Sequence, residues 1–301
     1  MSEQLPQARV SARAAAALAP ERVSLGIAYV LAAVTAMTIM DAAAKWLGAG
    51  YPIVEVVFFR NFFAIPPIVL LVWYGGGLAS LRTNRLPGHA LRAGFGLGAM
   101  FCFFTGLRYM PLAEAISLAF AAPLFVTALS VPVLKERVGV RRWAAVIVGF
   151  VGVLIITRPG SGVLRIEALL ILAAALSYAF FLLATRRLAR SESTSATLFY
   201  SNAISLLVGA LLLPFGWETP ASSDLMIFVT MGLVGGCGSY FMVLAYRNAP
   251  AAVLVPFDYT TLILGTLLGW LIWHELPDAT VFLGAAVVVA CGLFIIRRET
   301  R

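Results

Sequence analysis

The amino-acid sequence predicts an all-α, polytopic membrane protein whose ten transmembrane helices form two inverted five-helix repeats. Three observations support this prediction: the composition, ten long apolar runs and an internal repeat. Of the 301 residues, 61% are hydrophobic and only 12% are charged, and the mean hydropathy is +0.94. A soluble domain needs roughly a quarter of its surface residues to be charged. This chain lacks them, so we expect it to be embedded in lipid.

Ten apolar runs can cross the hydrocarbon core of a bilayer, which takes about 20 residues of helix. Glycine- and proline-rich breaks, such as residues 48–52, 75–77 and 158–160, separate these runs, and this composition is typical of turns. The predicted spans are 24–47, 53–74, 88–109, 111–134, 141–157, 166–187, 196–216, 223–247, 250–274 and 279–296. The fifth and the tenth are short.

The basic residues fix the orientation of these spans. With the N-terminus in the cytoplasm, 17 of the 22 Lys and Arg residues fall on the cytoplasmic side, four fall outside and Arg60 lies within a span. Cytoplasmic loops of membrane proteins carry such an excess. The sequence therefore predicts two cytoplasmic termini in a bacterial-type inner (plasma) membrane. Because the basic residues form short separate clusters, the net charge of +8 does not indicate a nucleic-acid partner.

The two halves of the chain resemble each other. We divide it into a cytoplasmic tail (1–23), a first repeat (24–158) and a second repeat (166–298). Five spans per repeat is an odd number, so the repeats have opposite orientations, and transporters built this way bind their solute near the midplane. An offset of 139 residues aligns Arg108 with Arg247, Pro111 with Pro250 and Glu136 with Glu275, and an offset of 141 aligns Lys45 with Arg186 and Asn61 with Asn202.

Two segments carry a family resemblance. Residues 134–156 hold a Leu-Lys-Glu-Arg motif around Glu136, followed by a glycine-rich span, and residues 273–296 repeat the plan around Glu275. This arrangement resembles the EamA family of the drug/metabolite transporter superfamily, over essentially residues 24–298. The resemblance implies a ten-span secondary transporter that works by alternating access. Relatives include aromatic amino acid exporters of the YddG type, and residues 40–47 are also similar to vitamin and S-adenosylmethionine carriers.

Four ionisable residues are predicted to form an outer charged layer within the membrane. Asp41 and Lys45 are four residues apart and share one helix face, and Arg60 and Glu114 lie at similar depths in the second and fourth spans. Buried charges usually face a cavity or a partner. The layer is either a structural ion-pair network or a clamp or gate for the solute. In the second repeat, the positions equivalent to Asp41, Arg60 and Glu114 hold neutral residues. The fold therefore does not require these charges, which favours a functional role.

Asp258 is the predicted centre of the substrate cavity. It lies about 12 Å into the ninth span, using the helical rise per residue, and Pro250 and Pro256 precede it. A midplane carboxylate either packs against a neighbouring hydroxyl or holds a substrate amine or a coupling proton. The cavity candidates are Asp258, Tyr259, Ser117, Phe120, Phe101, Tyr178, Tyr240 and Asn202.

The leading interpretation is a transporter that exports amino acids, including aromatic ones, or related small metabolites. The alternative is an importer of a vitamin or nucleoside-like metabolite, of the riboflavin or S-adenosylmethionine type. An intramembrane enzyme is a second alternative, but the two histidines, His89 and His274, lie far apart at span ends. We expect no catalytic activity, no cofactor and no metal site. The expected partners are the solute and the bilayer, with a coupling proton and the oligomeric state left open.

Overall fold

The computed structural model describes residues 20–136, 138–158, 166–189 and 191–299, and these residues contain helices but no strand. The predicted tail 1–23 lies largely outside them. The helices of the first half are α2 (Pro20–Gly50), α3 (Ile53–Phe63), α4 (Ile65–Tyr74), η1 (Gly77–Leu81), α5 (Leu86–Leu107), α6 (Leu112–Ala119), α7 (Ala122–Leu134) and α8 (Val140–Thr157). Those of the second half are α9 (Ile166–Leu188), α10 (Thr194–Leu212), η2 (Leu213–Phe215), α11 (Ser222–Asn248), α12 (Ala251–Asp258), α13 (Thr260–Trp273) and α14 (Ala279–Glu299).

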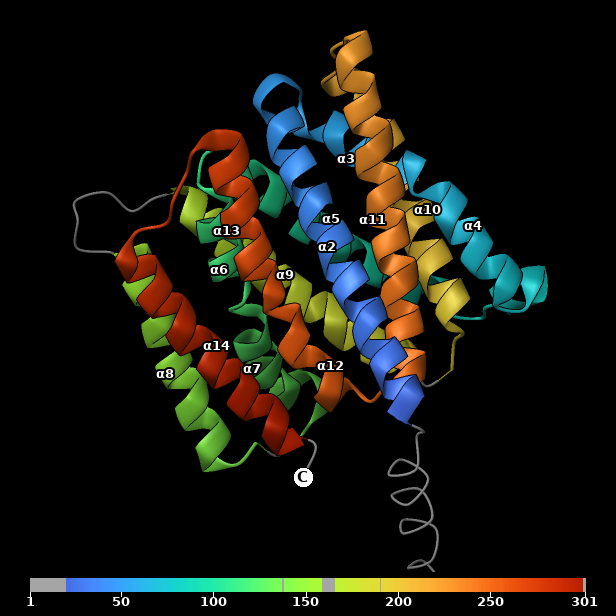
Figure 1. The fold of residues 1–301 in the computed structure, drawn as a ribbon. Helices are drawn as coiled ribbons and strands as arrows, with labels where there is room; N and C mark the ends of the chain where they lie inside the picture. Colours follow the sequence, from blue (N-terminus) through green and yellow to red (C-terminus); the bar gives the residue numbers. More distant parts are fainter. Residues whose placement is uncertain (1–19, 137, 159–165, 190, 300–301) are drawn as a thin grey trace, which may run out of the picture.

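These helices account for the ten predicted spans, so the predicted fold class is confirmed. Within the described residues, nine helical segments are long and apolar enough to cross a membrane, and α14 contributes a shorter apolar stretch at Ala279–Ile295. The beginning of α2 and the end of α14 lie at the same end of the bundle (Figure 1). An even number of spans between two cytoplasmic termini produces this arrangement.

Three spans are each made of two consecutive helices. The second span divides at Ala64, the fourth at Phe120–Ala121 and the ninth at Tyr259. The spans predicted at 53–74 and 111–134 are continuous, and prolines explain why the helices divide there. Both α4 and α7 begin with proline in their first turn, where the missing N–H and the fixed φ are tolerated, whereas proline in a helix interior breaks a hydrogen bond.

The internal repeat is visible in the backbone. Phe120 and Tyr259 end the first helices of the fourth and ninth spans, and they are 139 residues apart. At the same offset, Lys135 and His274 both adopt left-handed conformations, with φ of 58° and 55°. Such a residue commonly caps a helix C-terminus. Two unrelated segments would not be expected to share both a break and a cap in register.

The two repeats interlock along their lengths. The most extensive contacts join α2 to α11, α5 to α9 and α8 to α14, and each of these pairs contains one helix from each half. Figure 1 shows α8 and α14 together on one flank and α2 beside α11 on the other. Small residues allow the close approach: the Cβ that an alanine would add at Gly235 of α11 would lie 2.5 Å from the Met40 sulfur of α2. The central cavity therefore has walls from both halves.

Candidate functional site

A cavity of about 370 Å³ lies between the first four and the sixth to eighth spans. Its size is in the range of small-molecule sites. Charged residues are few among its mainly apolar walls, which is the usual composition of a site that orients a bound solute. The lining residues that carry polar side chains are Asp41, Arg60, Asn61, Arg92, Tyr178, Ser201, Asn202, Ser205 and Ser239.

The cavity lining includes an acidic and a basic side chain from two helices of the first half. Asp41 comes from α2 and Arg60 from α3, and the two interact electrostatically. Nη1 of Arg60 donates to Oδ1 of Asn61 at 3.2 Å, whereas its Nε is buried without a hydrogen-bond partner. A buried donor without a partner is costly. A solute carboxylate in the cavity would be a suitable acceptor for it.

Arg92 forms a second basic site, nearer the cytoplasmic end of α5. It is 4% exposed. Its Nε donates to Oγ1 of Thr185 at 2.7 Å, its Nη1 donates to the Thr197 carbonyl at 3.0 Å, and its guanidinium lies 4.0 Å from the Phe181 ring centroid. Such a position over an aromatic face is favourable for a cation. None of the carboxylates in the described parts of the chain forms a salt bridge with Arg92.

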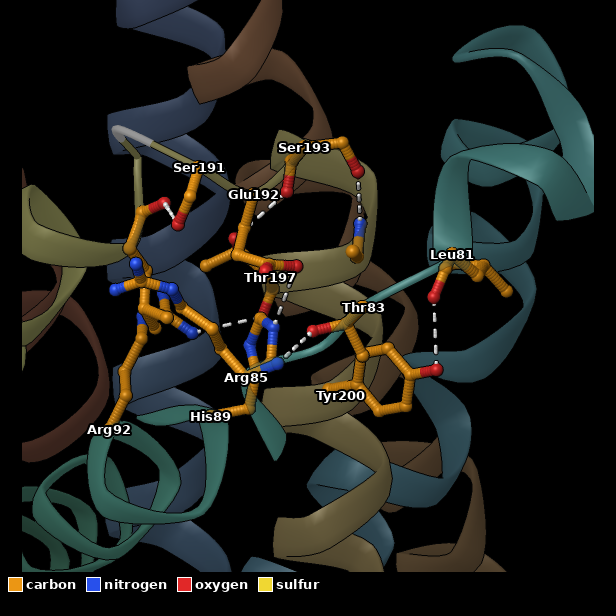
Figure 2. Close-up of polar contacts among 12 residues, drawn as sticks. Leu81, Thr83, Arg85, His89, Arg92, Ser191, Glu192, Ser193, Thr197 and Tyr200 are labelled. Carbon is orange, nitrogen blue, oxygen red and sulfur yellow. Dashed lines mark hydrogen bonds and ion pairs between the residues drawn. The ribbon is translucent and has the colours of Figure 1, made fainter. Parts of the chain in front are cut away.

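A polar cluster at the cytoplasmic end of the bundle holds the Arg92 region in position (Figure 2). Nε2 of His89, which is fully buried, lies 3.4 Å from Oε2 of Glu192. The Tyr200 hydroxyl donates to the Leu81 carbonyl at 3.0 Å, and its ring packs against His89. These contacts join η1 and α5 of the first half to α10 and the segment before it. They hold the helix that carries Arg92 against α10, whose Thr197 carbonyl accepts a hydrogen bond from Arg92.

Aromatic and sulfur-containing side chains form the rest of the wall. Tyr178 and Phe181 of α9 are stacked with ring centroids 5.5 Å apart, and Phe103 and Phe104 of α5 also line the cavity. A Cβ added at Gly96 of α5 would lie only 3.1 Å from the Phe181 ring, so this glycine makes room for the aromatic wall. Flat aromatic surfaces of this kind bind planar ring systems by stacking.

Four of the residues predicted from sequence line this cavity: Asp41, Arg60, Tyr178 and Asn202. The structure separates the predicted outer layer into two groups. Lys45 does not pair with Asp41 although both lie on one helix face; its Nζ donates to Oε2 of Glu275 instead. Glu114 is buried in α6, outside the cavity lining.

Six other candidates also lie outside the lining. Ser117 donates to the Ala113 carbonyl at 2.7 Å and borders a separate, almost wholly apolar pocket. Phe120 and Tyr259, which are equivalent positions of the two repeats, pack on each other with centroids 4.8 Å apart. The remaining three are Phe101, Tyr240 and Asp258.

Asp258 does not belong to the residues that line the cavity. It interacts electrostatically with Tyr178, which lines the cavity, and with Tyr246 of α11. Its Oδ1 is buried and has no hydrogen-bond partner. Asp258 is therefore linked electrostatically to a lining residue, Tyr178, although it does not itself border the cavity.

Arg92 is one of the lining residues that were not predicted from the sequence; Asn61, Phe181, Ser201, Ser205 and Ser239 are others. Arg92 was counted among the cytoplasmic orientation signals, although it lies inside the predicted span 88–109. Its position inside a predicted span could have identified it as a candidate lining residue. Among the described residues, no group of three His, Cys, Asp or Glu side chains is arranged to hold a metal ion.

The chain matches the model of the EamA-like transporter family twice, over residues 24–158 and 165–298. It is 31% identical to the S-adenosylmethionine uptake transporter of Rickettsia prowazekii (strain Madrid E) over 279 residues, which cover 92% of this chain and 94% of that protein. It is 32% identical to the riboflavin transporter of Rhizobium johnstonii over 292 residues, 95% of each chain. A pseudopaline exporter of Pseudomonas aeruginosa is 29% identical over 269 residues, 88% of this chain and 94% of that protein.

A solved crystal structure has the same fold, with a TM-score of 0.64 at 21% identity over 93% of this chain and 97% of the other. The family match, the length of the alignments and the apolar spans agree with one another. They describe a multi-pass transporter of the bacterial inner membrane. The chain belongs to the EamA-like transporter family, within the drug/metabolite transporters.

Proposed function

We propose that this protein transports a zwitterionic metabolite that carries a planar heteroaromatic ring, with S-adenosylmethionine as the leading candidate. The observation that carries the proposal is the cavity lining, which combines Asp41, Arg60 and Arg92 with the stacked rings of Tyr178 and Phe181. A free amino acid group has an ammonium for Asp41 and a carboxylate for an arginine. Charge-assisted hydrogen bonds of this kind are the stronger ones.

The rest of S-adenosylmethionine also matches the walls. Its adenine is a planar ring system that can stack on Tyr178 or Phe181. Its sulfonium is a cation, and aromatic faces attract cations. The relatives that carry S-adenosylmethionine in their names support this candidate.

Riboflavin is the second candidate. The lining contains hydroxyl and amide groups on α10 and α11, namely Ser201, Asn202, Ser205 and Ser239, which suit a neutral, hydroxyl-rich solute. Riboflavin has no amino acid group, so it would leave Asp41 and the two arginines without a direct role. Export of amino acids, including aromatic ones, is the leading interpretation from sequence, and these solutes would use the same zwitterion contacts. An amino acid without an aromatic side chain would leave much of the aromatic wall empty.

Counterflow into proteoliposomes tests the proposal. Vesicles containing the purified protein are loaded with unlabelled S-adenosylmethionine, riboflavin or phenylalanine, and uptake of the labelled form of each is measured. We expect counterflow of S-adenosylmethionine that Asp41→Asn reduces by about tenfold or more, as expected when one partner of a buried charge pair is removed. Counterflow of riboflavin alone, unaffected by Asp41→Asn, would favour the second candidate and reject the first.

A further inference from the structure

The outer end of α2 is fastened to the other half of the molecule by Lys45. Its Nζ forms an ion pair with Glu275, donates to the Met110 carbonyl at 3.0 Å and lies 4.8 Å from the Trp273 ring centroid. Lys45 is 7% exposed. Glu275 follows α13, so the ion pair joins the first span to the ninth at the outer side of the membrane.

The internal repeat assigns a counterpart to each member of this pair. Lys45 corresponds to Arg186 and Glu275 corresponds to Glu136. The acidic counterparts share local geometry, because the Glu275 N–H donates to the Gly269 carbonyl and the Glu136 N–H donates to the Ser130 carbonyl, again 139 residues apart. Arg186 lies in the last turn of α9 and Glu136 follows α7. The equivalent pair would therefore lie at the cytoplasmic side.

The cytoplasmic pair is absent in this structure. Glu136 is exposed and forms no ion pair with any residue in the described segments. The helix ends are nevertheless adjacent, because the neighbouring Arg187 donates a hydrogen bond from its guanidinium to the Val133 carbonyl at the end of α7. Of two ion pairs related by the repeat, the outer is formed, whereas Glu136 of the inner one has no ion-pair partner among the described residues.

Inverted repeats make this asymmetry informative. In such transporters, one half moves against the other, and the site opens alternately to each side. When the halves exchange conformations, a contact on the outer side in one state is replaced by its equivalent on the inner side in the other. We infer that Lys45–Glu275 is an outer latch that closes the cavity toward the outside, and that Arg186–Glu136 is the inner latch that forms when the cavity opens outward.

The two latches make opposite predictions for equivalent substitutions. Glu275→Gln removes the outer latch and should favour the outward-open state, whereas Glu136→Gln removes the inner latch and should disfavour it. A structural role alone would give both substitutions the same sign or no effect on conformation. Coupling between contacting charges corresponds to a shift of about threefold or more in such a population ratio.

Labelling of a cysteine in the cavity measures this ratio without any substrate. Cys102, Cys237 and Cys291 are replaced by serine, Ser201 is replaced by cysteine, and membrane vesicles of known orientation are treated with an impermeant maleimide. In right-side-out vesicles, Glu275→Gln should raise the labelling rate about threefold and Glu136→Gln should lower it. In inverted vesicles, both changes should reverse sign.

A charge exchange controls for loss of fold. Lys45→Glu combined with Glu275→Lys should return the labelling rate to the parent value, and the melting temperature of each variant in detergent shows whether it is folded. Changes of the same sign for Glu275→Gln and Glu136→Gln, or unchanged rates in folded protein, would overturn the latch proposal. Neither result would bear on the substrate, because labelling requires none.

Discussion

The two halves share a backbone plan, but they bring different chemistry to the cavity. Among the described lining residues, the three acidic or basic side chains, Asp41, Arg60 and Arg92, all come from the first half, whereas the polar groups from the second half include Tyr178 and Asn202. The breaks in the fourth and ninth spans and the caps that follow these spans are nevertheless matched between the halves. The fold therefore does not require the charges.

Individual repeat positions make the contrast sharper. Asp41 corresponds to Leu182 and Arg60 to Ser201, so a charge pair in one half has an apolar and a hydroxyl counterpart in the other. A charged group inside a membrane is energetically costly. Charged residues that have no charged counterpart in the other repeat are therefore expected to act on the solute. Substitutions at equivalent positions can test this difference.

The largest expected effect on transport comes from substituting a charged residue of the first half. Arg60→Gln leaves Asp41 without its basic neighbour and removes the proposed carboxylate partner, so we expect counterflow of S-adenosylmethionine to fall by about tenfold or more. The equivalent Ser201→Ala removes one hydroxyl and should change it by less than about threefold, the scale of one neutral hydrogen bond. Initial rates in proteoliposomes measure both.

The double variant Asp41→Asn with Arg60→Gln separates folding from transport. If the charges only stabilise each other, the double variant should regain both melting temperature and transport, because no charge is left unpaired. We expect it to regain melting temperature alone. Equal transport losses in Arg60→Gln and Ser201→Ala would contradict the functional difference between the halves.

Asp258 provides the next prediction, because it is an acid of the second half that lies outside the cavity lining. We propose that it carries a coupling proton and communicates with the solute through Tyr178, with which it interacts electrostatically. Asp258→Asn should then abolish accumulation driven by a pH gradient. The rate of counterflow should stay within about twofold of the parent rate, because the substitution removes no contact to the solute. Loss of counterflow would instead make Asp258 a direct substrate ligand.

The spans could be predicted from sequence because the requirement for apolar residues in lipid acts on each helix separately. Asp41 and Arg60 could be identified for the same reason, since a charge in an apolar run is conspicuous. Arg92 could not, because an arginine near a helix end is expected to extend toward the interface. Here Thr185 and the Thr197 carbonyl, both from the other half, hold it inward.

The Lys45–Glu275 pair was also beyond the reach of the sequence. The local rule places Lys45 beside Asp41, four residues before it, but the partner found in the structure is 230 residues away. Such a choice depends on how the halves pack. Asp258 illustrates the same limit, since depth along a helix can be read from sequence but rotation toward a cavity cannot.

Glycines of equivalent spans provide a smaller test. A Cβ at Gly236 of α11 would lie 2.5 Å from Cγ of Pro67 and 3.1 Å from the Cα of Ala64, which cannot move independently of the backbone. A Cβ added at Gly94 of α5, the equivalent span, would have no neighbouring atom within 4 Å. Overpacking costs about 1–3 kcal/mol, so Gly236→Ala should lower the melting temperature and Gly94→Ala should not. A lower value for Gly94→Ala alone would show that α5 and α11 are packed differently from the structure.

The smallest effect is expected where the halves are most alike. Lys135 and His274 end equivalent helices in left-handed conformations, with φ of 58° and 55°. This conformation costs a residue with a Cβ about 1–2 kcal/mol, and glycine avoids that cost but loses more entropy on folding. Lys135→Gly and His274→Gly should therefore each stabilise the protein by a few tenths to about 1 kcal/mol, seen as a small rise in melting temperature. Both cap positions serve the backbone shared by the repeats, so the two gains should be similar. A gain at only one of them would mean that side-chain contacts, which differ between the halves, outweigh the common backbone even here.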